Sequence, residues 1–147
     1  MMYNALNVLL VEDDPGDVEL TRDSLKDCKL NLNLAVVDDG EKAMAYLYKQ
    51  GRYTGVPTPD VVLLDLNMPR KDGREVLREM REDPHLRSIP VVVLTTSEAE
   101  ADVLSAYLNG ANCYITKPIG LAQFSKVVHA ISDFWFTVVK LPPAPVL

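Results

Sequence analysis

Short aliphatic runs alternate with segments of helical spacing along nearly the whole sequence. The aliphatic runs, which predict strands, cover residues 6–11, 32–37, 60–65, 89–96 and 112–116. Apolar residues at helical spacing follow each run, over residues 15–29, 40–48, 73–82, 98–109 and 120–135. Five strand-then-helix units predict an α/β fold with a five-stranded parallel sheet, doubly wound in a (βα)5 arrangement. Such sheets place their functional sites at the carboxyl ends of the strands.

The composition fits one globular domain. The chain has 147 residues, of which 48% are hydrophobic, and this is enough for one core. We expect residues 6–135 to form the domain, with residues 136–147 as a Pro-rich tail. The net charge of −6 argues against a nucleic-acid partner, which requires a basic face. The chain lacks both a signal peptide and a run of roughly 18 apolar residues, so we expect a cytoplasmic protein without a membrane partner.

Acidic residues directly follow two of the predicted strands. Glu12, Asp13 and Asp14 come after the first strand, and Asp65 comes after the third. If these strands are neighbours in the sheet, two or three carboxylates converge at one edge. Like charges that lie so close need a cation between them, and a set of oxygen ligands suits Mg²⁺.

The fourth and fifth strands end in two further polar groups. Thr95 offers a hydroxyl at the same edge of the sheet, and Lys117 offers a positive charge for Asp65 or for a phosphoryl oxygen. A carboxylate nucleophile, Mg²⁺, an ammonium group and a hydroxyl are the groups needed to accept a phosphoryl group in line. The pattern therefore predicts a site with the groups needed to accept a phosphoryl group.

Four separated motifs carry a family resemblance. They are "LLVEDD", "VVLLDLNMPRKDG", "VVVLTTS" and "YITKP", and in this order and spacing the chain resembles the receiver domain of two-component response regulators over about residues 6–135. The resemblance implies a flavodoxin-like receiver fold and a histidine kinase as phosphoryl donor. It also implies that Asp65 is the phosphoacceptor, with Glu12 and Asp13 as the acidic pair. The backbone carbonyl of Asn67 is then a further ligand of Mg²⁺ or Mn²⁺.

The same resemblance implies a conformational switch. Thr95 corresponds to the switch hydroxyl, Lys117 to the phosphate-binding lysine and Tyr114 to the switch aromatic residue. Two alternatives stay open. Tyr114 can be an ordinary strand residue, because strands favour tyrosine. Glu12 stands where many members have aspartate, so its longer side chain can also reach the metal through a water molecule.

A narrower resemblance concerns the partner kinase. The segments "DGREVL", "IPVVVLTTS", "NCYITKP" and "FWFTVVKLPPAP" are similar to single-domain regulators paired with bacterial phytochrome kinases. The chain stops shortly after the last predicted helix, so we expect no output domain. The resemblance implies a stoichiometric phosphoacceptor, with self-catalysed phosphorylation and dephosphorylation, rather than an enzyme.

Two other functions are weighed against this one. A Mg²⁺-dependent phosphohydrolase with an aspartyl-phosphate intermediate is the first, and the haloacid-dehalogenase type needs a second aspartate two residues after the nucleophile. That position is Asn67, which cannot serve as a general acid. A flavin-binding protein is the second, but the segment "EDDP" after the first strand repels phosphate.

The C-terminal region predicts self-association. Phe124, Val128, Ile131 and Trp135 recur at helical spacing, and neighbouring apolar residues widen this face beyond one core contact. We expect a homodimer through the helix at 98–109, the strand at 112–116 and the helix at 120–135, clasped by the tail. The alternative is a tail that folds back over its own domain.

Other charged residues have simpler interpretations. Asp14 is expected to cap the helix that follows it, and Asp38 and Asp39 to cap the next helix along the chain. Arg70 and Lys71 are expected to be solvated loop charges first and partner contacts second.

Overall fold

The computed structural model describes residues 6–26, 32–66, 68, 70–95 and 113–116. Its elements are β1 (Leu6–Val11), α1 (Pro15–Lys26), β2 (Leu32–Val37), α2 (Gly40–Leu47), the 3-10 helix η1 (Gly51–Tyr53), β3 (Val61–Leu64), α3 (Gly73–Glu82), β4 (Val91–Thr95) and β5 (Cys113–Thr116). The helices expected over 98–109 and 120–135, and the tail 136–147, lie outside the described residues. Within the described part of the chain, no helix is long and apolar enough to cross a membrane.

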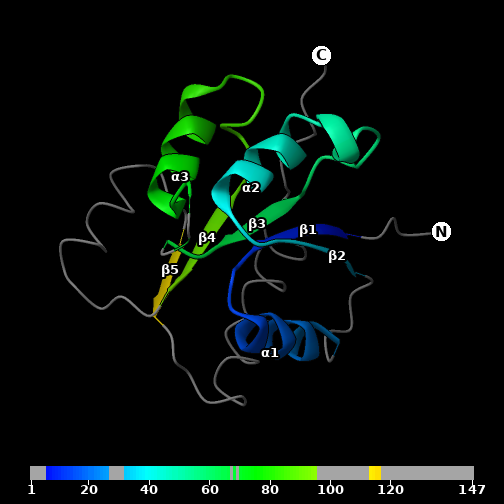
Figure 1. The fold of residues 1–147 in the computed structure, drawn as a ribbon, viewed down its shortest axis with the longest axis vertical. Helices are drawn as coiled ribbons and strands as arrows, with labels where there is room; N and C mark the ends of the chain where they lie inside the picture. Colours follow the sequence, from blue (N-terminus) through cyan, green and yellow to red (C-terminus); the bar gives the residue numbers. More distant parts are fainter. Residues whose placement is uncertain (1–5, 27–31, 67, 69, 96–112, 117–147) are drawn as a thin grey trace.

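The strands form one parallel sheet in the order β2-β1-β3-β4-β5 (Figure 1). β1 pairs with β2 on one side and with β3 on the other, so that Val11 lies beside both Val37 and Leu64. Because the strands are parallel, each connection from one strand to the next must cross over the sheet, as strand-then-helix units do. The predicted five-stranded parallel sheet is therefore confirmed, and the first and third strands are neighbours.

Helices cover both faces of the sheet. Figure 1 shows α1 against one face and α2 with α3 against the other. Alternate strand residues divide accordingly. Leu9, Val11, Val62, Leu64, Val91 and Val93 belong to the core under α2 and α3, whereas Val8, Leu10, Val61, Leu63, Val92 and Leu94 belong to the core under α1. Burial on both faces explains why these strands read as continuous aliphatic runs.

Two strand boundaries are tighter than the sequence predicts. β4 begins at Val91 rather than at residue 89, because the Ile89 amide donates instead to the Leu86 carbonyl in a turn, at 3.0 Å. β3 is assigned to Val61–Leu64, although the amides of Asp60 and Asp65 still donate to β1, to Asn7 at 2.7 Å and to Val11 at 3.0 Å. β3 is thus tied to β1 at both ends.

In α2 and α3, the residues that helical spacing predicts to face the core are buried, with one exception. In α3, Val76, Leu77 and Met80 recur at helical spacing, which predicts that they face the core, and all three are fully buried. In α2 the spacing also predicts an inward Tyr48, and this is wrong: Tyr48 is the C-cap residue and is 39% exposed. Tyr46 is buried in its place, where its ring lies 5.2 Å from that of Tyr53.

Candidate functional site

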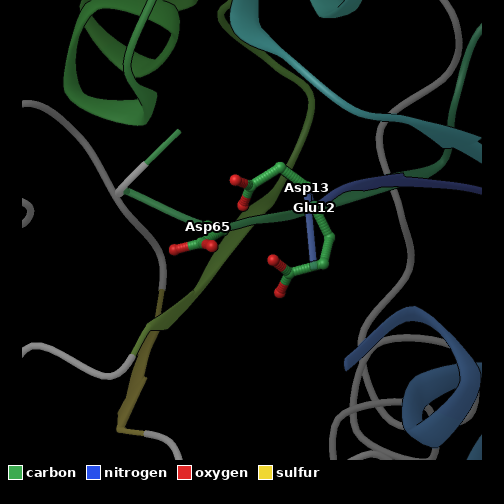
Figure 2. Close-up of side chains that lie close together, drawn as sticks. All are labelled: Glu12, Asp13 and Asp65. Carbon is green, nitrogen blue, oxygen red and sulfur yellow. The ribbon is translucent and has the colours of Figure 1, made fainter. Parts of the chain in front are cut away.

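The pairing of β1 with β3 brings three acids to one edge of the sheet. Glu12 and Asp13 follow β1, and Asp65 follows β3 (Figure 2). Backbone hydrogen bonds fix both strand ends, because the Glu12 amide donates to the Val37 carbonyl and the Asp65 amide to the Val11 carbonyl, each at 3.0 Å. As a result, carboxylate oxygens of all three acids lie within 4.8 Å of one another. The predicted convergence of Glu12, Asp13 and Asp65 is what the structure shows.

The three acids differ in burial. Glu12 is 3% exposed and Asp65 is 7% exposed, whereas Asp13 faces solvent. The Glu12 carboxylate accepts a hydrogen bond from the Asp14 amide at 3.2 Å, which orients it at the end of β1. Bringing two buried and one exposed carboxylate this close is unfavourable unless a positive charge compensates.

A divalent cation fits this donor set. The cluster offers only carboxylate oxygens, which are the ligands that Mg²⁺ and Mn²⁺ prefer. The exposed Asp13 leaves one side of the cluster open to water, and Mg²⁺ usually keeps several of its water ligands. The arrangement can therefore hold a hydrated divalent cation directly beside the Asp65 carboxylate.

The other predicted site residues are placed only in part. Thr95 is the last residue of β4 and pairs with Thr116 of β5, so its backbone lies at the same carboxyl edge as Asp65. Tyr114 lies in β5 beside Val93. Asn67 and Lys117 are outside the described residues.

The predicted helix caps are confirmed for two acids. The Asp14 carboxylate accepts from the Gly16 amide at 2.8 Å at the start of α1, and Asp39 accepts from the Lys42 amide at 2.7 Å at the start of α2. Asp38 does not cap α2 through its side chain among the described contacts. Its carboxylate pairs with the Lys42 ammonium at 2.7 Å, and this hydrogen bond lowers the pKa of Asp38 below its usual range.

The loop between β3 and α3 approaches the site closely. A Cβ atom at Gly73 would overlap the carbonyl oxygen of Asp65, so only glycine allows α3 to start so near the end of β3. The Gly73 amide donates to the Leu66 carbonyl at 2.9 Å. The Asp72 carboxylate then caps α3 by accepting from the Glu75 amide at 3.1 Å.

Sequence reasoning missed two ion pairs in this loop. Arg70 was expected to be solvated, and its side chain is indeed 62% exposed, but its guanidinium also donates to the buried Asp39 carboxylate at 3.0 Å. Lys71 pairs with Glu79 of α3. The two partners of the first pair are 31 positions apart in the sequence, so no local spacing could have indicated the contact.

Comparisons with known proteins agree with this geometry. The chain matches the response regulator receiver domain family over residues 8–129. It is 47% identical over 137 residues to the response regulator Rcp1 of Synechocystis sp., an alignment that covers 93% of each chain. Among solved structures, the phosphorylated cyanobacterial phytochrome response regulator RcpA superposes with a TM-score of 0.90 at 44% identity, over 95% of this chain and 100% of that one. The Mn²⁺-bound form of Rcp1 superposes with a TM-score of 0.87 at 46% identity, over 94% of this chain and 99% of that one.

Proposed function

Because the chain belongs to the response regulator receiver domain family, we propose that Asp65 accepts a phosphoryl group from a histidine kinase with the help of Mg²⁺. One observation carries this assignment. The Asp65 carboxylate stands at the end of a central strand, with oxygens of Glu12 and Asp13 within 4.8 Å of its own. A related structure with bound Mn²⁺ and another that is phosphorylated support the same chemistry.

The transfer moves a phosphoryl group between two side chains. A carboxylate oxygen of Asp65 attacks the phosphorus atom while the bond from phosphorus to the kinase histidine nitrogen breaks, and the aspartyl phosphate and a histidine are left. Bound Mg²⁺ supplies positive charge for the phosphoryl oxygens during this transfer. Glu12 and Asp13 hold the cation, and Asp65 is positioned by its place at the end of β3. The Asn67 carbonyl completes the proposed ligand set.

Three further residues complete the proposal. The Lys117 ammonium binds a phosphoryl oxygen, and the Thr95 hydroxyl moves toward the new phosphoryl group. The phosphorylated side chain carries roughly −1.5 to −2 charges, where the Asp65 carboxylate carries a single one. Its new oxygens attract the Lys117 ammonium as a charge and the Thr95 hydroxyl as a hydrogen-bond donor. Tyr114 turns inward as Thr95 moves, so the surface around β5 changes. Replacing Thr95 by alanine should preserve labelling but remove the phosphorylation-dependent change in partner affinity.

Labelling with acetyl phosphate and Mg²⁺ tests the assignment. The expected result is an uptake of about one phosphoryl group per chain, with self-catalysed transfer and slow self-catalysed loss. Continued release of many phosphates per chain would instead indicate a phosphohydrolase. The family match gives that alternative no support. No labelling in the presence of Mg²⁺ would overturn the proposal.

The similar proteins suggest the pathway. Relatives described as cyanobacterial phytochrome and bacteriophytochrome response regulators align over 95% of this chain, so we propose a phytochrome-type histidine kinase in the cytoplasm as the phosphoryl donor. We also propose that residues 6–135 act as one receiver domain. The signal then passes to a second copy of the chain through the regions 98–109, 112–116 and 120–135, with the tail 136–147 as a clasp.

A further inference from the structure

We propose that Asp39 and Arg70 are positioning residues for the phosphoacceptor site. Their ion pair ties the loop that leaves Asp65 to the start of α2, and it thereby keeps the three metal-binding carboxylates in register. This inference rests on the proposed function, because it assigns the pair a role in cation binding at that site.

Asp39 is a buried carboxylate with both oxygens engaged. It is 3% exposed, and its Oδ1 accepts from the Lys42 amide at 2.7 Å while its Oδ2 accepts from an Arg70 guanidinium nitrogen at 3.0 Å. A buried carboxylate without a charged partner is costly. The charge of Asp39 therefore holds Arg70, and with it the loop, against the N-terminus of α2.

Arg70 adopts a backbone conformation that residues other than glycine rarely adopt. Its φ is 67°, in the left-handed region that suits glycine. Its side chain is 62% exposed, so burial of the side chain does not account for this conformation. The ion pair with Asp39 is the described contact that compensates for the strained backbone.

Two close backbone contacts connect this pair to Asp65. A Cβ at Gly40 would overlap the carbonyl oxygen of Lys71, so the loop backbone lies directly on the first residue of α2. At the other end of the loop, Gly73 lies against the Asp65 carbonyl. The loop is thus pressed between α2 and the phosphoacceptor. A displacement of Arg70 from Asp39 reaches Asp65 through a short stretch of packed backbone.

The chain offers a matched control pair beside this one. Asp38 and Lys42 form an ion pair at 2.7 Å, with side chains that are 60% and 40% exposed, on α2 and the residues just before it. Lys42→Gln removes one positive charge from α2, as Arg70→Gln removes one from the loop. It breaks no described contact between α2 and the loop.

The test measures Mn²⁺ binding to the full unphosphorylated chain by the electron paramagnetic resonance signal of free Mn²⁺. Asp39→Asn keeps the helix cap, because asparagine caps as well as aspartate, and Arg70→Gln removes only the guanidinium. We expect each variant to bind Mn²⁺ about tenfold more weakly, at the low end of the roughly 10- to 100-fold loss seen for outer residues that orient metal ligands. The double variant should bind about as weakly as either single one, because both changes break the same contact.

The sign of the Arg70→Gln effect separates positioning from simple electrostatics. Loss of a positive charge near a cation site tightens cation binding if only the field matters, so Lys42→Gln should bind Mn²⁺ equally well or more tightly. We expect Arg70→Gln to weaken binding despite its lost charge, with partial recovery in Arg70→Lys. Unfolding curves should show that Arg70→Gln remains folded.

Arg70→Gln that binds Mn²⁺ as tightly as the wild-type chain, or more tightly, would overturn the positioning role. If Arg70→Gln does not fold, Asp39→Asn is compared with Asp38→Asn, which removes the same negative charge from the neighbouring ion pair, and equal Mn²⁺ affinities of these two variants would overturn the positioning role. A wild-type chain that binds no Mn²⁺ would overturn the proposed function itself, and the positioning role with it.

Discussion

The backbone amide of Asp65 donates to the carbonyl oxygen of Val11 at 3.0 Å. Val11 is the residue before Glu12, so this one hydrogen bond aligns the end of β3 with the start of the acidic segment after β1. Asp65 lies 52 positions after Asp13 and 53 positions after Glu12 in the sequence. The register between β1 and β3 therefore determines the geometry of the site.

Replacing Asp65 by asparagine should abolish labelling by acetyl phosphate. The amide has nearly the same shape but is not a nucleophile, so the fold should persist while the reaction is lost. Asp60→Asn is a matched control at the opposite end of β3, where the described contact of the side chain is a hydrogen bond accepted from the Asn7 amide at 2.8 Å. Phosphoprotein gels and mass spectrometry of the labelled chain measure the difference. Equal labelling of Asp65→Asn and the wild-type chain would contradict the assignment.

Magnesium should stabilise the folded chain. A ligand at 100 times its dissociation constant adds about 2.7 kcal/mol to the free energy of unfolding if it binds only the native state. We expect the urea midpoint to rise when Mg²⁺ replaces a chelator, and to rise far less in Asp13→Asn. The same substitution at the exposed Asp38, outside the cluster, should leave the magnesium effect intact. A magnesium effect that survives in Asp13→Asn would show that the cation binds elsewhere.

Adding one methyl group at Gly73 should disturb both stability and labelling. An alanine Cβ would overlap the Asp65 carbonyl oxygen, and overpacking of this kind costs about 1–3 kcal/mol of unfolding free energy. At Gly16 the nearest atom to an added Cβ is the flexible Asp14 carboxylate, at 3.2 Å. Gly16→Ala is therefore the control, with an expected change within about 0.5 kcal/mol. Chemical unfolding measures both, and equal effects would show that the Gly73 contact relaxes freely.

The contact between α2 and α3 should make stability depend on alkaline pH. The Tyr48 hydroxyl donates to Asp83 at 2.9 Å, and partial burial, together with this hydrogen bond, raises the pKa of Tyr48 from 10.0 to about 12. Between these two values the unfolded chain loses its proton first. The contribution is thus complete below pH 10 and is lost as pH rises to about 12.

Tyr48→Phe should remove this part of the pH dependence. Its free energy of unfolding should be lower than that of the wild-type chain at pH 7, and the difference should shrink toward pH 12. Urea unfolding at pH 7, 10 and 11 provides the measurement. Parallel curves for the two proteins across this range would mean that Tyr48 does not titrate differently in the folded state.

Self-association should depend on residues 120–135, which the sequence predicts to be helical, and on the tail 136–147. Sedimentation at micromolar concentration, with and without phosphoryl donor, should show a dimer that phosphorylation tightens, because Tyr114 and Lys117 lie on or next to the proposed interface. A chain that ends at Asp133 lacks Trp135 and the apolar tail residues, and should be monomeric. A full-length chain that is monomeric in both states would rule the dimer out.

The sequence predicts the sheet well because its signals are local. Runs such as residues 61–64 are buried on both faces, and no other common arrangement buries so many consecutive aliphatic residues between helices. Tyr48 shows where this reasoning fails. Helical spacing places it with the core residues of α2, but the helix ends at Leu47, and beyond that point the periodicity no longer indicates a direction.

The contacts at the site also differ in whether they arise from regular strands or from an irregular loop. The meeting of Glu12, Asp13 and Asp65 follows from strand order. The alternation of strands and helices predicts a parallel sheet but leaves that order open, and the order β2-β1-β3-β4-β5 makes the first and third strands neighbours. The pairing of Arg70 with Asp39 does not follow, because it depends on the path of an irregular loop and on the missing Cβ atoms at Gly40 and Gly73.

The pairing of β1 with β3 also determines when the site comes into existence. A peptide copying residues 61–73 would contain Asp65 but neither of its acidic neighbours, and in a nascent or unfolded chain the three acids are present but not held together. The three carboxylates meet only after a long loop has closed and two distant strands have found their register. Phosphoryl transfer to Asp65, as proposed, therefore requires a chain in which the central sheet has formed. A phosphorylated chain is thus one that has already folded.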